Sequence, residues 1–253
     1  IYRESLNPAG LLRRKLAAAS FAVTCTGANL DHLRALGAAT PVHLVYHGLN
    51  PDFARLVAGS TGAAPDGPLR IVSIGTAVEK KGFDVLVDAV ARLRVGGTDV
   101  RLVLAGEAGP ADETIAAAVA GHGLGDVVER RGPLSQPELV DLLGVSHVFA
   151  LACRVAGDGD RDGIPNVLVE AMAAGVAVVS TRVSGIPELV TDGCDGLLVA
   201  PDDAAGLAAA LARLAADPAL RARLAAAGRR TVAARFDGDL LTRRLADLMG
   251  AAS

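Results

Sequence analysis

Residues 160–180 read DRDGIPNVLVEAMAAGVAVVS and contain a turn, a helix start, an apolar helix, a glycine corner and a buried strand. Pro165 suits the first turn of a helix, where its missing N–H costs nothing, and Gly163 leaves the preceding backbone open to a close ligand. The free amides and positive dipole end of such a helix favour a phosphate. Asn166 and Glu170 share one helix face. An ordinary αβ unit has the same pattern, so this stretch alone leaves both interpretations open.

The composition favours an α/β protein. Of the 253 residues, 51% are apolar and only 3% aromatic, which requires a core of small aliphatic side chains packed in helix and sheet layers. Apolar strands alternate with helices, which predicts a Rossmann-like, doubly wound, mostly parallel sheet. The predicted strands are 70–75, 100–105, 127–130, 147–152, 176–180 and 197–199, and the helices around the central one are 82–94, 113–122, 137–143, 204–216, 218–229 and 240–249.

The first part of the chain forms a separate small pattern. Helices at 11–19 and 29–36 and strands at 21–26 and 42–46 make a βαβ piece that is too small to enclose a core, and it looks like the end of a preceding Rossmann-type domain. The segment 54–69 is rich in Gly and Pro and is predicted to be a linker, with a domain boundary near 47–68. The chain opens without Met, as if cut from something longer.

Charge and metal-ligand patterns argue against several classes of function. A net charge of -3 with interspersed signs gives no electrostatic footprint for nucleic acid. The three cysteines show no C-x-x-C spacing, which suits a reducing compartment and argues against a disulfide framework or structural zinc. The five histidines lack the spacing of an H-E-x-x-H helix, so no metal site is predicted. No apolar run approaches the roughly eighteen residues of a membrane span.

Ligands of open α/β sheets bind beyond the carboxyl ends of the strands. The loop after the first of these strands contains Gly75 and Thr76, followed by Lys80 and Lys81 just before a helix start, where a cation is a plausible phosphate partner. Two lysines that only keep a loop soluble explain the pattern equally well. Glu188 is interpreted as an acid in the first turn of a further helix. The G-x-G-x-x-G dinucleotide fingerprint is absent from these loops.

In order, these pieces resemble the C-terminal, donor-binding half of glycosyltransferase family 4, whose members are nucleotide-sugar enzymes of the GT-B fold. The resemblance rests on segments 47–50, 74–82, 104–107, 132–135, 160–180, 185–188, 195–199, 217–221 and 227–229. Residues 160–166, together with Ile1-Tyr2, look most like the branch that builds exopolysaccharide or colanic-acid-type surface glycans.

The resemblance implies roles for particular residues. Two acids separated by seven residues mark the family's donor site, and they fall on Asp162 and Glu170. Glu170 is expected to hold the ribose hydroxyls and Asp162 to face the donor sugar, while Lys81 and the 163–166 backbone hold the diphosphate. The implied catalytic residues are Asp162, Glu170 and Lys81, and the implied donor-binding residues are Gly75, Thr76, Lys81, Gly163, Ile164, Pro165, Asn166 and Glu170.

The implied reaction transfers a hexose, with retention, from a UDP- or GDP-linked donor to a cell-surface polysaccharide or lipid-linked precursor, without metal or other cofactor. The implied domains are residues 1–47, a remnant of the N-terminal acceptor domain; 48–236, the donor domain; and 237–253, a helix that packs back toward the N-terminal domain. The implied location is the cytoplasm, at the inner face of the plasma membrane, with peripheral attachment through the missing N-terminal domain.

Two departures from the family pattern bear on activity. Asp162 replaces the usual Glu, and Thr76 replaces the usual Arg after Gly75. With most of the acceptor domain expected to be missing before Ile1, the chain alone is expected to bind a donor but not to transfer it efficiently. A non-catalytic nucleotide-sugar-binding module, or a degenerate remnant, is the alternative, and an NAD-dependent Rossmann oxidoreductase is a weaker one.

Overall fold

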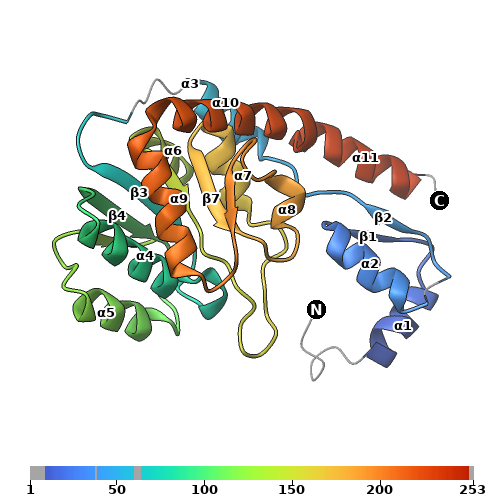
Figure 1. Cartoon of the computed structure of the whole chain (residues 1–253). Helices are drawn as coiled ribbons and strands as arrows, with labels where there is room; N and C mark the ends of the chain where they lie inside the picture. The colour runs from blue at the N-terminus through green and yellow to red at the C-terminus, as the bar shows by residue number, and fades with distance from the viewer. Residues whose placement is uncertain (1–8, 38, 60–63, 251–253) are drawn as a thin grey trace.

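The computed structural model describes residues 9–37, 39–59 and 64–250, and it contains a six-stranded and a two-stranded parallel sheet (Figure 1). The large sheet has the order β5-β4-β3-β6-β7-β8, the order of Rossmann domains, which confirms the predicted α/β class. Its strands are β3 (Leu69–Ile74), β4 (Val100–Ala105), β5 (Val128–Arg131), β6 (Val148–Ala150), β7 (Ala177–Thr181) and β8 (Leu197–Val199). Central strands such as β7 are buried on both faces, as their apolar runs predict.

Helices cover both faces of the large sheet (Figure 1). One layer contains α4 (Phe83–Val95), α5 (Asp112–Gly121) and α9 (Ala204–Ala216), which contact one another through α4. The other contains α3 (Pro51–Gly59), α6 (Gln136–Gly144) and α7 (Asn166–Ala173). The long α10 (Pro218–Arg235) contacts both α7 and α9, so it ties the two layers together.

The predicted linker over 54–69 is wrong in its first part, because α3 extends to Gly59. The Asp52 amide donates to the Asn50 side chain at 2.8 Å, Pro51 opens the helix, and Phe53 is completely buried in the main core. The free energy gained by burying the ring of Phe53 outweighs the tendency of the Gly and Pro residues that follow to end a helix. Residues 60–63 of the predicted linker lie outside the described residues, as do Ile1 and Tyr2.

The predicted end of the helix at 218–229 is also wrong, because α10 continues to Arg235. Gly228, one residue before the predicted end, is buried inside α10. A Cβ at this position would lie 3.1 Å from the Asp195 carbonyl oxygen and 3.3 Å from Met172 Cε. Glycine therefore serves here to let α10 approach α7 closely. The next helix, α11 (Gly238–Gly250), leaves Leu240 and Met249 more than half exposed.

The first part of the chain folds as α1 (Ala9–Ala17), β1 (Ala22–Thr24), α2 (Gly27–Ala35) and β2 (Val42–Leu44), with β1 and β2 parallel. The chain passes between this part and the larger unit at a neck formed by residues 46–49 and 236–238. The Leu49 amide donates to the Phe236 carbonyl at 2.7 Å, and the rings of Tyr46 and Phe236 pack with centroids 5.0 Å apart. Beyond the neck, α11 lines a hollow of about 330 Å³ with β1, Cys25, Asn29 of α2 and residues 45–48. The boundaries at 47 and 236 remain predictions.

Candidate functional site

The site predicted from sequence lies where the strand order reverses. The chain leaves β3 toward β4 on one side of the sheet and leaves β6 toward β7 on the other, so the loops after β3 and β6 converge at their shared edge. The Arg154 amide donates to the Lys80 carbonyl at 3.0 Å. Gly82 has a left-handed φ of 61°, and a Cβ there would overlap the Ala152 carbonyl oxygen. The two loops therefore pack backbone to backbone.

Lys81 and Asp162 meet at this junction, although 81 residues separate them in sequence. Lys81 Nζ donates to Asp162 Oδ2 at 2.6 Å, and the two side chains are only 13% and 15% exposed. The stem of Lys81 runs across Gly75, where an added Cβ would lie 3.1 Å from Lys81 Cε. The structure thus brings together three of the predicted site residues, with Thr76 half-buried beside Gly75.

Lys80 joins the same cluster. Its Nζ lies 3.1 Å from Asp160 Oδ2 and 3.4 Å from Asp162 Oδ1. Burial opposes the charge on this ammonium, but the hydrogen bond to Asp160 and the charge of Asp162 outweigh it and raise the Lys80 pKa. Lys80 therefore stays cationic at neutral pH. The sequence showed Lys80 only as a neighbour of Lys81, with no assigned role.

The start of α7 lies beside this cluster, as predicted. Pro165 immediately precedes Asn166, the first helical residue, so the first-turn amides face outward from the helix end. The Gly185 amide donates to the Gly163 carbonyl at 3.2 Å, and a Cβ on Gly185 would come within 2.9 Å of the Ile164 side chain. Residues 163–164 are thus held against the loop that leads to α8 (Ile186–Leu189).

Glu170 occupies the second turn of α7, and unlike Asp160 and Asp162 its carboxylate does not pair with a lysine. Its side chain is largely buried, and this burial raises its pKa above the ordinary value. Within the part of the chain that the structure describes, its carboxylate makes no hydrogen bond or ion pair, so it is not bonded to Lys81 or to the first-turn backbone. A largely buried carboxylate without a protein partner is costly unless a ligand supplies hydrogen bonds.

Two residues of this region were not identified as site residues from the sequence. Arg154 joins the loops: its guanidinium donates to the Glu79 carbonyl at 2.9 Å and pairs with Asp84 and Asp202. No local spacing signals these contacts, since the partners lie 48 to 75 residues away.

Glu188 lies in the first turn of its own helix, α8, as predicted, and its carboxylate in addition bonds the start of α2. Oε2 accepts from the Gly27 amide at 2.7 Å and from the Tyr46 hydroxyl at 3.1 Å, while Oε1 accepts from the Ala28 amide at 3.1 Å. The start of α2 is thereby docked beside the site. Thr26 packs there as well, because a Cβ on Gly163 would meet its methyl group at 3.0 Å.

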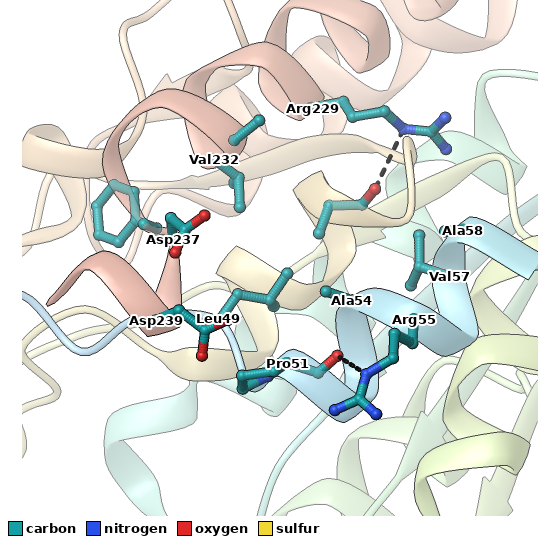
Figure 2. Close-up of a pocket in the computed structure, with 14 residues that line it drawn as sticks. Leu49, Pro51, Ala54, Arg55, Val57, Ala58, Arg229, Val232, Asp237 and Asp239 are labelled. Carbon is teal, nitrogen blue, oxygen red and sulfur yellow. Dashed lines mark hydrogen bonds between the residues drawn. The ribbon is translucent and has the colours of Figure 1, made fainter. Parts of the chain in front are cut away.

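A separate pocket of about 600 Å³ lies away from these loops, between α3, α10 and the start of α11 (Figure 2). Its walls are mostly apolar, with Leu49, Val57 and Val232 among them. Arg229, at its edge, donates to the Ala173 carbonyl at 3.1 Å. None of the predicted donor-site residues lines it. We place the functional site at the strand edge rather than here, because the charged groups and helix amides lie there.

Among the residues that the structure describes, no group of three or more His, Cys, Asp or Glu side chains is arranged to hold a metal ion. None of the helices between residues 9 and 250 combines the length and apolar character needed to cross a bilayer.

Comparison with known proteins identifies the family. Residues 68–217 match the model of the glycosyl transferases group 1 family. WcaL of Salmonella typhimurium, named for colanic acid biosynthesis, is 35% identical over 86% of this chain and 53% of its own length. The amylovoran biosynthesis glycosyltransferase AmsK of Erwinia amylovora is 36% identical over 72% of this chain and 44% of its own length. The chain thus spans about half the length of these relatives.

Solved structures agree with the fold. Sucrose-phosphate synthase of Thermosynechococcus elongatus superposes with a TM-score of 0.82 at 26% identity, covering 97% of this chain and 62% of that chain. Anabaena Alr3699/HepE, solved in complex with UDP-glucose, gives a TM-score of 0.79 at 21% identity over 98% of this chain and 69% of its own. Since the family model covers more than half of the residues, this chain belongs to the glycosyl transferases group 1 family, and its fold is that of the part of the GT-B structures on which it superposes.

Proposed function

We propose that this chain carries the donor site of a retaining glycosyltransferase, which moves a hexose from a UDP- or GDP-linked sugar to a cell-surface polysaccharide or lipid-linked precursor. The observation that carries the proposal is Glu170, a largely buried carboxylate without a protein partner in the described chain, one turn into the helix whose start meets the Lys81–Asp162 pair. A pair of ribose hydroxyls would satisfy both of its oxygens. Relatives named for exopolysaccharide biosynthesis support the acceptor class.

The role proposed for each site residue follows from its charge. Lys81 and the amides at the start of α7 would hold the diphosphate and stabilise the negative charge that develops as it leaves. Asp162 would face the donor sugar. The acceptor hydroxyl attacks from the face of departure, so the anomeric configuration is retained. Because fixed cations and amides neutralise the leaving group, the reaction needs no bound metal; most of the catalysis is positioning.

We assign the acceptor site to the part of the relatives that this chain does not match. Residues 1–47 then belong to the acceptor domain, 48–236 to the donor domain and 237–253 to a helix that packs back on the acceptor domain. The exposed Leu240 and Met249 of α11 support this division. The whole enzyme would work in the cytoplasm, at the inner face of the plasma membrane, and the present chain alone would bind a donor without transferring it efficiently.

The test is ligand-observed NMR of the chain with UDP-, GDP-, ADP- and dTDP-sugars, repeated with Glu170→Ala. We expect saturation transfer to the ribose and base of one nucleotide, and its loss in the variant. Glu129→Ala, which removes an exposed carboxylate from the edge strand β5, is the matched control and should bind normally. Equal binding by Glu170→Ala and the native chain would contradict the assigned role of Glu170.

A non-catalytic nucleotide-sugar-binding module is the second candidate function. Thr76 favours it, because an uncharged side chain follows Gly75 where the family usually has a cation. Sugar transfer by the chain joined to the part of WcaL that it does not match, assayed with the donor found by NMR, separates the two. Donor binding without transfer or donor hydrolysis would favour the module.

A further inference from the structure

In the Lys80–Lys81–Asp162 cluster, the two lysine ammonium groups already bind an anion, which is the carboxylate of Asp162. Lys80 Nζ lies 3.4 Å from Asp162 Oδ1, and Lys81 Nζ lies 2.6 Å from Asp162 Oδ2. The two ammonium groups thus bind the two oxygens of one carboxylate. This is also how two cations would hold neighbouring oxygens of a diphosphate.

The two lysines lie in a single 3-10 turn, η1 (Glu79–Lys81), whereas the acid lies in an irregular segment. The Lys80 carbonyl accepts from the Arg154 amide, and the stem of Lys81 lies against Gly75 at the end of β3. Asp162 belongs instead to the segment between β6 and α7, which has no helix or strand. Because both lysines belong to one helical turn and Asp162 to an irregular segment, the carboxylate is the group that would move in a rearrangement of this cluster.

A diphosphate cannot share this cluster with Asp162 without cost. All three side chains are less than a quarter exposed, so the charges are only partly screened by water. Two cations already face the carboxylates of Asp160 and Asp162, so the cluster carries no surplus positive charge. An added diphosphate would face Asp162 as a like charge a few ångströms away.

We propose that Asp162 is a built-in competitor of the donor's diphosphate, and that Lys80 is a second diphosphate cation beside Lys81. The proposal rests on the donor site proposed above. In the empty site the carboxylate of Asp162 holds both ammonium groups; on binding, the diphosphate displaces it, and the freed carboxylate faces the donor sugar. Lys80 thereby supplies the cation that Thr76 does not. When the sugar has been transferred, the returning carboxylate helps to expel the nucleoside diphosphate.

The length of Asp162 is consistent with this exchange. Asp is one methylene shorter than the Glu that usually occupies this position in the family. With the backbone as it stands, the short side chain places its carboxylate on the lysines rather than farther into the site. Having Asp rather than Glu at position 162 thus determines how strongly this carboxylate pairs with the two lysines when no ligand is bound.

The test is calorimetric titration of the 253-residue chain with inorganic pyrophosphate, UDP and GDP at low ionic strength. Removing the competing charge in Asp162→Asn should tighten pyrophosphate binding by at least about fivefold, the effect of one like charge in a partly screened site. Asp160→Asn, which frees only Lys80, should tighten it less, and this variant serves if Asp162→Asn does not fold. Lys80→Met should weaken binding in either background. Asp126→Asn, which removes a carboxylate paired with Arg94 far from the site, is the matched control.

The outcomes separate this inference from the proposed function. Tighter pyrophosphate binding in Asp162→Asn supports the inference, even if no nucleotide binds, in which case only the proposed function fails. If the native chain binds UDP or GDP but Asp162→Asn binds no anion more tightly, Asp162 orders the lysines for the ligand and the inference is wrong. If folded Asp162→Asn and the native chain bind none of the three ligands, both proposals are wrong.

Discussion

Replacing Glu188 with Ala should undock the start of α2 from the region of the candidate site. The substitution removes the acceptor of two backbone amides and one hydroxyl, from Gly27, Ala28 and Tyr46. A hydrogen bond to a charged acceptor contributes about 1.5–3 kcal/mol when protected and less when exposed. The bond from Ala28 is exposed and the other two are partly buried, so we expect the three together to contribute about 2–4 kcal/mol to docking.

Hydrogen–deuterium exchange measures this directly. If Glu188 holds the start of α2, the amides of Gly27 and Ala28 should exchange at least about 30-fold faster in Glu188→Ala, the factor that corresponds to 2 kcal/mol of local opening. Glu188→Gln retains one acceptor oxygen and should give a smaller increase. Amides of α5 provide the internal control, because that helix lies at the other edge of the large sheet.

Tyr46 provides a second, independent readout. Burial raises the pKa of its hydroxyl, and the negative charge of Glu188 raises it further. In a Tyr2→Phe background, an ultraviolet titration should therefore show a lower Tyr46 pKa in Glu188→Gln than in the native chain. Because the raised pKa favours the protonated phenol in the folded state, docking should weaken as the pH rises through that pKa. Unchanged exchange at Gly27 and Ala28, with an unchanged Tyr46 pKa, would refute the docking role.

Three further predictions concern the core of the site. Burial raises the pKa of Glu170, so ionisation of this carboxyl group destabilises the folded state as the pH rises. Urea denaturation of Glu170→Gln should therefore show a higher free energy of unfolding than the native chain at about pH 7 but not at about pH 3. The same variant should bind nucleotide more weakly. Gly82→Ala should lower the free energy of unfolding by more than about 3 kcal/mol, because it combines a left-handed φ with backbone overlap. Gly97→Ala, with a similar φ but open space, should cost only about 1–2 kcal/mol, and equal losses for the two variants would contradict the close loop packing. Burial, with the charge of Asp162, raises the pKa of Cys153 to about 12, so iodoacetamide should alkylate the exposed Cys194 but not Cys153 in the folded chain, as followed by peptide mass spectrometry.

The sequence was sufficient for the sheet and for part of the site. Buried apolar strands separated by helices have few alternatives to a parallel doubly wound sheet, and the strand order then brings the loops after β3 and β6 together. The proximity of Gly75, Lys81 and Asp162 follows from this topology. The individual roles of these residues came from the family resemblance and stay predictions.

The remaining features depend on tertiary contacts that no local pattern encodes. The linker prediction failed because the burial of Phe53 stabilises α3, and the helix end predicted at 229 failed because Val232, beyond it, is buried in the main core and α10 continues to Arg235. Glu188 was correctly placed in the first turn of a helix, but the partners of its carboxylate, which lie 142 to 161 residues earlier in the chain, were not predicted. Such long-range pairing is invisible to spacing rules.

The neck between the two sheets has a mechanical consequence. The chain passes between them at Gly48 and again at Gly238, and the two glycines touch because neither has a side chain. The bond from the Leu49 amide to the Phe236 carbonyl prevents the two passages from sliding along each other. A rotation at residues 48 and 238 would carry the start of α2 away from α7, so it would have to break the hydrogen bonds that Glu188 accepts from Gly27 and Ala28. The backbone contact at the neck and the carboxylate of Glu188 therefore hold the small sheet at two separate points.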